Sequence, residues 1–196
     1  LSDDYYYEKN MYDLAQRKLQ KIAARWPQDQ ETLFKLATVY YKRGMKKFAL
    51  EKYNGVIKIH SSSDFSRKAL INIALINTQI DTSEKALKES LQNLQKALLI
   101  KPGDPEALFA LGKIYVKKAM YTKAIEIFYQ VVKGTREKKL VADAYNNIGL
   151  CYFNRKEYRN ALRAFTRGID EDPSNEKIRL NRKTASKAYE QSLMRQ

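Results

Sequence analysis

Four short segments of the chain repeat one pattern of residue sizes at a nearly constant interval. In each segment, two apolar residues three positions apart are followed by a small residue and then, in three segments of four, by a tyrosine. The small residues lie 37, 38 and 37 positions apart along the chain: Ala37, Ala74, Gly112 and Gly149. Self-similarity at such a period is typical of stacked repeats, in which each unit is one supersecondary element.

A second apolar run follows each segment, and its spacing is helical. Ala49, Tyr53 and Val56 follow the first segment at i, i+4 and i+7, and residues 124–131 repeat this spacing after the third. Such a run places one apolar face on a helix. One helix pair buries too little to form a core alone, whereas stacked pairs form a continuous one. No stretch of strand length alternates with a period of two, so we expect an all-α chain.

Helix-breaking residues mark the boundaries of the units. Residues 102–105 carry two prolines and a glycine, and Asp104 with Pro105 predicts a helix start with aspartate as the N-cap. Ser83 is placed to cap the helix that follows it. We expect one domain, residues 1–196, with a truncated first repeat at 1–29, repeats at about 30–63, 64–103, 104–140 and 141–174, and a capping helix at 175–194.

Composition excludes several classes of protein. The chain has 196 residues, one cysteine, one histidine and a formal net charge of +15. No apolar run is long enough for a transmembrane helix, and a lone cysteine cannot form an internal disulfide or a cysteine-based zinc site. A charge this positive favours acidic partners. Because the chain starts at Leu1, we expect a fragment or a processed product. We also expect a soluble protein of the cytoplasm or of a bacterial periplasm, since a lone cysteine is compatible with either.

The repeated residues resemble those of the tetratricopeptide repeat family. The match is close in the two units that begin at Leu111-Gly112 and Ile148-Gly149, each continued by two tyrosines, an alanine and a phenylalanine. The family repeat has 34 residues, so the longer period here implies extra residues, which we expect to lengthen loops at 79–84 and 134–140. The resemblance implies a right-handed superhelical solenoid of antiparallel helix pairs and a scaffold that binds other proteins in a concave groove.

Little in the sequence suggests catalysis. A nucleophilic pair would need Cys151 beside His60, and a linear solenoid is expected to keep these two residues three repeats apart. No glycine pattern suited to binding phosphate is present. We therefore predict no enzymatic activity, no catalytic residue, no metal site and no cofactor.

The resemblance also implies which positions face the groove. These are the positions one residue after the bulky residue, one after the small residue, and one or two after the repeat tyrosine. They form three rows: Phe34, Ile71, Phe109 and Asn146; Thr38, Leu75, Lys113 and Leu150; and Tyr41, Thr78, Val116 and Phe153, with Lys42, Lys117 and Asn154 beside them and Tyr7 from the truncated unit. Several could instead pack between neighbouring helices.

These rows are more apolar than a solvated helix face, which is typical of an interaction surface. The predicted ligand is a helix or peptide segment of another protein, with apolar anchors and acidic residues that the lysines would attract. A carboxylate clamp for chaperone tails, which uses Lys and Asn in the opening rows, is not expected, because Phe34 and Thr38 stand there.

A row of arginines offers a second candidate surface. Arg155, Arg159, Arg163 and Arg167 recur every fourth residue and would share the convex face of a helix. This basic convex face could bind nucleic acid or an anionic surface, although no aromatic residue interleaves it for base stacking. A solvated basic face is the plainer interpretation. A third possibility is homo-oligomerisation or complex assembly through exposed repeat ends.

Overall fold

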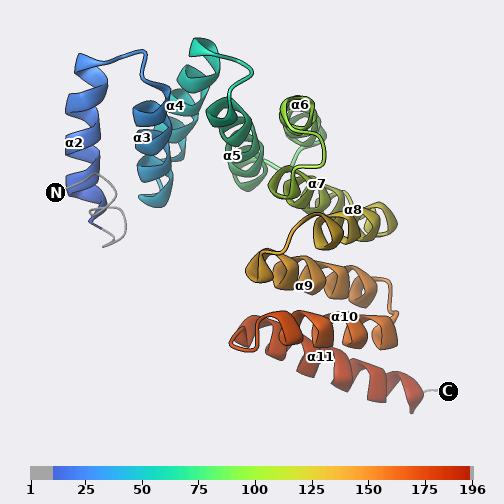
Figure 1. Ribbon diagram of the computed structural model, residues 1–196. Helices are drawn as coiled ribbons and strands as arrows, with labels where there is room; N and C mark the ends of the chain where they lie inside the picture. Colours follow the sequence, from blue (N-terminus) through green and yellow to red (C-terminus); the bar gives the residue numbers. More distant parts are fainter. Residues whose placement is uncertain (1–10, 195–196) are drawn as a thin grey trace. The chain divides into compact units, whose positions relative to one another are not determined.

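The computed structural model describes residues 11–194, and over those residues it consists of ten helices joined by short loops (Figure 1). The helices are α2 (Tyr12–Arg25), α3 (Gln30–Lys42), α4 (Lys46–Ile59), α5 (Asp64–Ile80), α6 (Glu84–Ile100), α7 (Pro105–Lys117), α8 (Tyr121–Gly134), α9 (Lys138–Asn154), α10 (Tyr158–Glu171) and α11 (Glu176–Leu193). The all-α prediction is confirmed.

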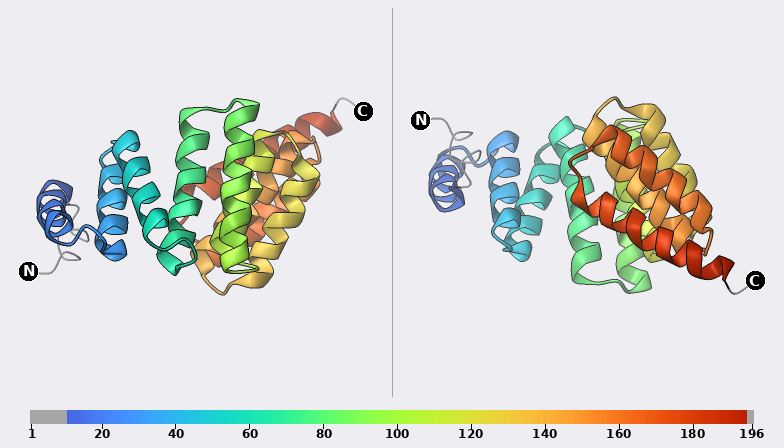
Figure 2. Two further views of the ribbon diagram at one scale, coloured as in Figure 1. Left: turned by 90° about the horizontal axis from the view of Figure 1, so that it is seen from above. Right: turned by 90° about the horizontal axis from the view of Figure 1, so that it is seen from below.

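The chain divides into two compact units, Leu1–Pro102 and Gly103–Gln196. In the first unit α3 packs on α4 and α5 on α6, and in the second α7 packs on α8 and α9 on α10, with α11 against α10 (Figure 2). Each pair is antiparallel because a loop of three residues reverses the chain between its helices. The helix pairs are confirmed, and the extent of a single domain stays a prediction.

The residues that lengthen the period lie mostly in helices, and the expectation of longer loops is wrong. Helices α5, α6 and α9 have 17 residues each, whereas α3, α4, α7, α8 and α10 have 13 or 14. Only three residues separate α5 from α6 and α8 from α9. The cause is local, since residues 138–141 are Lys-Lys-Leu-Val, which contain no helix breaker and mostly favour helix.

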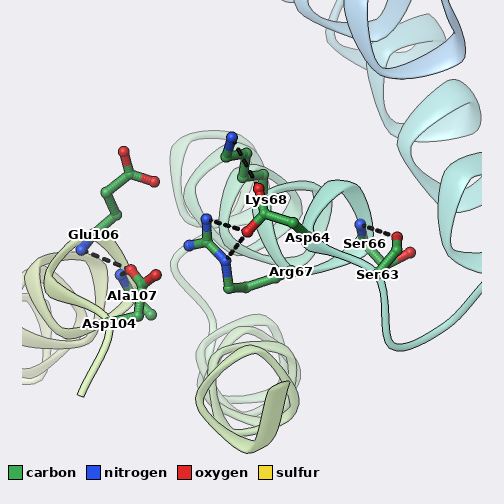
Figure 3. A network of polar contacts seen from close by, with 8 residues as sticks. All are labelled: Ser63, Asp64, Ser66, Arg67, Lys68, Asp104, Glu106 and Ala107. Carbon is green, nitrogen blue, oxygen red and sulfur yellow. Dashed lines mark hydrogen bonds and ion pairs between the residues drawn. The ribbon is translucent and has the colours of Figure 1, made fainter. Parts of the chain in front are cut away.

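Side-chain caps fix where several helices start. At the start of α5, the Ser63 hydroxyl accepts a hydrogen bond from the backbone N–H of Ser66 at 3.0 Å (Figure 3). In the first turn of α5 the carboxylate of Asp64 accepts a hydrogen bond from Arg67 Nε at 2.7 Å and pairs with Lys68 Nζ at 3.0 Å. The Arg67 hydrogen bond is the main reason why the pKa of Asp64 lies below its usual value.

The predicted cap at Asp104 is present. Its carboxylate accepts hydrogen bonds from the backbone N–H groups of Glu106 at 2.9 Å and Ala107 at 3.0 Å, and Pro105 occupies the first helical position of α7 (Figure 3). Ser83 also caps α6, as expected, by accepting from the N–H of Ala86. These caps satisfy N–H groups that the first turn of a helix leaves without intrahelical partners.

The apolar faces of the helices form the cores of the two units. In the first unit, the fully buried ring of Tyr53 lies among core residues of α3, α4 and α5, and its hydroxyl lies 3.0 Å from Thr38 Oγ1 and accepts from Asn72 Nδ2 at 3.1 Å. In the second, Phe165 of α10 and Ile178 of α11 are buried together.

Within residues 11–194, no helix has both the length and the apolar content that a membrane crossing requires.

Candidate partner-binding faces

The first candidate face lies on α3 and α5 of the first unit. The ring of Phe34 is half-buried, with its centroid 5.5 Å from that of Tyr53 and 5.8 Å from that of Phe65. The remaining edge of Phe34, the half-buried Leu75 and the exposed Lys42 are accessible on this face. Phe34 is therefore part of both the core and the surface.

Polar contacts fix other residues of this face. The Tyr41 hydroxyl on α3 accepts a hydrogen bond from Gln79 Nε2 on α5 at 2.8 Å. The Thr38 hydroxyl donates to the carbonyl of Phe34 at 2.9 Å. Ile71 and Thr78 are both only 4% exposed, so they cannot reach a partner as they stand. The accessible part of the face therefore comes mainly from α3 and from Leu75.

In the second unit, α7 contributes an aromatic ring bordered by lysines. The centroid of Phe109 lies 5.5 Å from that of the buried Phe128, in an edge-on arrangement, and Lys113 Nζ lies 6.0 Å from the Phe109 centroid. Val116 is half-buried and Lys117 is exposed. Within residues 11–194, neither Lys113 nor Lys117 lies within ion-pair distance of a carboxylate. Their charges are available to an acidic ligand.

Helix α9 adds a second apolar row to the same unit. Leu150 and Phe153 are half-buried against its core, and the Phe153 centroid lies 5.4 Å from that of Tyr158. Asn154 is exposed, and its Nδ2 donates to the carbonyl of Leu150. Asn146, by contrast, is 3% exposed and accepts a hydrogen bond from Asn181 of α11 at 2.8 Å. Its side-chain amide therefore joins α9 to α11 and does not face a ligand. Tyr7, the expected contribution of the first repeat, lies outside the described residues.

The four arginines of the predicted basic convex face differ in their surroundings. Arg155 Nη2 pairs with Glu157 at 2.7 Å, and its Nη1 donates to Thr122 at 3.1 Å. Arg159 Nη2 donates to the Tyr189 hydroxyl at 2.9 Å. The guanidinium carbon of Arg167 lies 5.9 Å from the centroid of Tyr145. The even spacing in the sequence therefore does not produce a uniform surface, because two of the four side chains hydrogen-bond neighbouring elements.

The lone cysteine is a buried group. Cys151 has 0% exposure, and burial raises the pKa of its thiol to about 11. A thiol with this pKa is almost entirely protonated near neutral pH, whereas nucleophilic attack needs the thiolate. Within residues 11–194, no three His, Cys, Asp or Glu side chains are grouped so that they could hold a metal ion.

One cavity combines residues that the sequence did not bring together. Tyr129 and Asn160 belong to neither predicted surface, and Tyr152 is the tyrosine of its repeat. With Arg163, Ala164 and Arg167 they line a cavity of about 210 Å³ in the second unit. In the sequence, only the regular spacing of the arginines pointed to this region. That spacing does not show which tyrosines lie beside the arginines.

Three segments of the chain match models of one family, each described as a tetratricopeptide repeat, at residues 31–63, 105–133 and 142–175. Among curated relatives, response regulator aspartate phosphatase E of Bacillus subtilis (strain 168) is 28% identical over 169 residues, which are 81% of this chain and 44% of that protein. The chain spans less than half the length of the curated relatives it matches.

Solved structures share the fold. A chain of the APC/C hetero-tetramer Cut9–Hcn1 superposes with a TM-score of 0.81 at 18% identity, covering 93% of this chain and 35% of that one. YrrB, described as a TPR protein with an unusual peptide-binding site, superposes with a TM-score of 0.64 at 19% identity, covering 93% of this chain and 88% of that one. At such identities the likeness concerns the fold alone.

Proposed function

Because the chain belongs to the tetratricopeptide repeat family, whose members mediate protein–protein interactions and complex assembly, we propose that it is a non-enzymatic scaffold. Its leading helices bind a helix or peptide segment of a partner protein. In the second unit this surface consists of Phe109, Lys113, Val116 and Lys117 of α7 with Leu150, Phe153 and Asn154 of α9, and we name it the α7–α9 face.

The single observation that carries this proposal is the surroundings of Phe109. Its ring packs on Phe128 but keeps an accessible side, and the same helix has two lysines that pair with no carboxylate among residues 11–194. Half-buried aromatic rings of this kind are typical anchors at interfaces. An apolar ligand residue would cover Phe109, Val116 or Leu150, while acidic residues flanking it would meet the lysines.

The first unit supports the same mode of binding on a smaller scale. Phe34 and Leu75 offer accessible apolar surface, and Lys42 is exposed beside them. Ile71 and Asn146 are not needed for the proposal because both are buried. The partner segment that we propose is acidic and amphipathic, because lysines border apolar side chains on both faces and the net charge of the chain is +15.

The proposal that the chain has no catalytic role rests on Cys151. Its burial and high pKa make it a poor nucleophile. The Bacillus subtilis relative carries the name of a phosphatase and is more than twice as long as the matched part, so that name does not bring a catalytic residue to this chain. A protein-binding role agrees with the family and requires no reactive group.

The test reverses charge at the edge of the α7–α9 face without disturbing its core. Lys113→Glu with Lys117→Glu changes two exposed side chains, and Lys123→Glu with Lys133→Glu makes the same change on α8. Wild type and both variants are used as baits in a nuclease-treated lysate. Each protein retained is then purified and titrated against the baits. Before the binding measurements, thermal melting followed by circular dichroism is used to check that both variants fold.

We expect a partner that binds wild type and the α8 variant with equal affinity and binds the α7 variant at least about tenfold more weakly, since close charge pairs at interfaces contribute on the order of 1.4 kcal/mol or more. Equal binding by all three baits would show that the α7–α9 face is not the site. A partner lost equally from both variants would indicate a general effect of charge and would also contradict the proposal.

A further inference from the structure

The small cavity of the second unit lies between three helices and is lined mainly by hydrogen-bond donors. Tyr129 comes from α8, Tyr152 from α9, and Asn160, Arg163 and Arg167 from α10. Its volume of about 210 Å³ is smaller than the 300–1,000 Å³ of pockets that enclose drug-sized ligands. It has room for one small group, and it shares no residue with the α7–α9 face.

The cavity has positive charge that nearby carboxylates do not neutralise. Arg163 and Arg167 lie one turn apart on α10, where like charges repel each other. In the part of the chain that the structure describes, neither makes an ion pair with a carboxylate. The other two arginines of the row differ, since Arg155 pairs with Glu157 and Arg159 binds Tyr189. An anion in the cavity would relieve the repulsion.

The two tyrosines add a donor to this charge. Tyr129 and Tyr152 both line the cavity beside the two arginines. Burial first, and Tyr152 second, raise the pKa of Tyr129, so its hydroxyl is protonated at neutral pH. A phenolic hydroxyl has one O–H donor, so each tyrosine can offer a hydrogen bond to an acceptor in the cavity.

The exposed Arg167 also has an aromatic neighbour on another helix. Its guanidinium carbon lies 5.9 Å from the ring centroid of Tyr145 on α9, a distance at which the ring attracts the cation. Because the guanidinium group is planar and presents its donors in a rigid fork, it loses less side-chain entropy for each hydrogen bond that it forms with an oxyanion. The cavity thus combines a cation beside an aromatic ring, a second cation one turn away and tyrosine hydroxyl donors.

We propose that this cavity binds one oxyanion group, a carboxylate or a phosphoryl group, through Arg163, Arg167 and the tyrosine hydroxyls. Guanidinium groups bind both kinds of oxyanion through parallel charge-assisted hydrogen bonds. The inference goes beyond the scaffold proposal and does not depend on it, because the helix faces involved are different. Of the four arginines of the basic convex face, the proposal assigns a ligand to Arg163 and Arg167 only.

The test is a titration in which ¹H–¹⁵N NMR spectra are recorded at each step. Inorganic phosphate, acetate and chloride are the probes, all at one ionic strength. The first variant, Arg163→Gln with Arg167→Gln, removes the charge and keeps good helix formers. The second, Tyr152→Phe, removes one hydroxyl. The matched control, Lys123→Gln with Lys133→Gln, removes the same charge from exposed positions on α8.

We expect saturable shifts in residues 160–167 of the wild type and the control with phosphate, acetate or both, at least about tenfold weaker binding in the arginine variant, and a smaller loss in Tyr152→Phe. Saturation with phosphate alone would identify a phosphoryl group, and saturation with both probes an oxyanion in general. Shifts that chloride reproduces, or that the arginine variant retains, would overturn the proposal.

Discussion

The ring of Phe165 fills the space that a side chain on Gly149 would need. A Cβ placed on Gly149 of α9 would lie 2.5 Å from Cε1 of this ring on α10, closer than real Cβ atoms come to other atoms. Gly112 and Phe128 of the preceding helix pair have the same relationship, at 2.7 Å. In the second unit, the small residue of the repeat is thus glycine because a buried phenylalanine lies directly against it.

Replacing this glycine should therefore destabilise the chain. We expect Gly149→Ala to lower the free energy of unfolding by about 1–3 kcal/mol, the usual cost of overpacking a core. Gly55→Ala on α4 is the control, because its Cβ would lie 3.7 Å from the nearest side-chain atom. It should stabilise by about 0.5–1 kcal/mol, since alanine favours helix over glycine. Urea denaturation measures both, and equal effects would refute the packing argument.

The cap of α6 offers a second test of stability. The Ser83 hydroxyl accepts from the N–H of Ala86, at 3.3 Å. Ser83→Ala leaves that N–H without its side-chain acceptor and should cost about 1 kcal/mol. Ser61→Ala, at an exposed loop position, should stay within about 0.5 kcal/mol of wild type. Thermal melting followed by circular dichroism distinguishes the two, and a Ser83 variant as stable as the Ser61 variant would argue against this cap.

Acid should weaken the first unit partly through Asp64. The Arg67 hydrogen bond holds the pKa of this carboxyl below its usual value in the folded chain. The carboxylate therefore contributes stability that is present above the unfolded pKa and is lost as pH falls through the folded one. Asp64→Asn should reduce the fall in melting temperature between pH 6 and pH 3. Lys68→Gln should retain most of that fall, because Arg67 is the larger influence.

The lone cysteine should react only when its helix opens. Cys151 is fully buried, and burial raises the pKa of its thiol to about 11. We expect Ellman's reagent to modify the native chain at pH 8 at least about a hundredfold more slowly than the urea-unfolded chain, because the native thiol is neither exposed nor ionised. Modification at the rate of the unfolded chain would show that the second unit opens readily.

The sequence predicted the features that depend on local chemistry. The caps at Ser83 and Asp104 could be recognised because each has a polar side chain directly before a helical pattern. The column of small residues predicted the helix pairs, because each marks a close approach of two helices. Each signal consists of neighbouring residues or of one residue type that recurs at the repeat period, so it can be interpreted without knowing which side chains meet in space.

Features that depend on a neighbouring element could not be predicted in this way. Asn146 occupies a groove position of its repeat, yet Asn181, 35 residues further along, covers it and binds its amide. The extra residues of the long repeats were expected in loops, but residues 138–141 contain no helix breaker and belong to α9. The cavity beside Arg163 and Arg167 could not be predicted from one repeat, because Tyr129 belongs to a different repeat.

The position of Phe109 has a consequence for finding a ligand. One side of this ring packs on Phe128 in the core, and the other borders the α7–α9 face. A ligand that covers the ring binds the folded chain and not the unfolded one, so it shifts the folding equilibrium by mass action. At a concentration of a hundred times its dissociation constant, this shift is about 2.7 kcal/mol. A rise in the melting temperature of the chain therefore reveals a ligand, even when the identity of the natural partner is unknown.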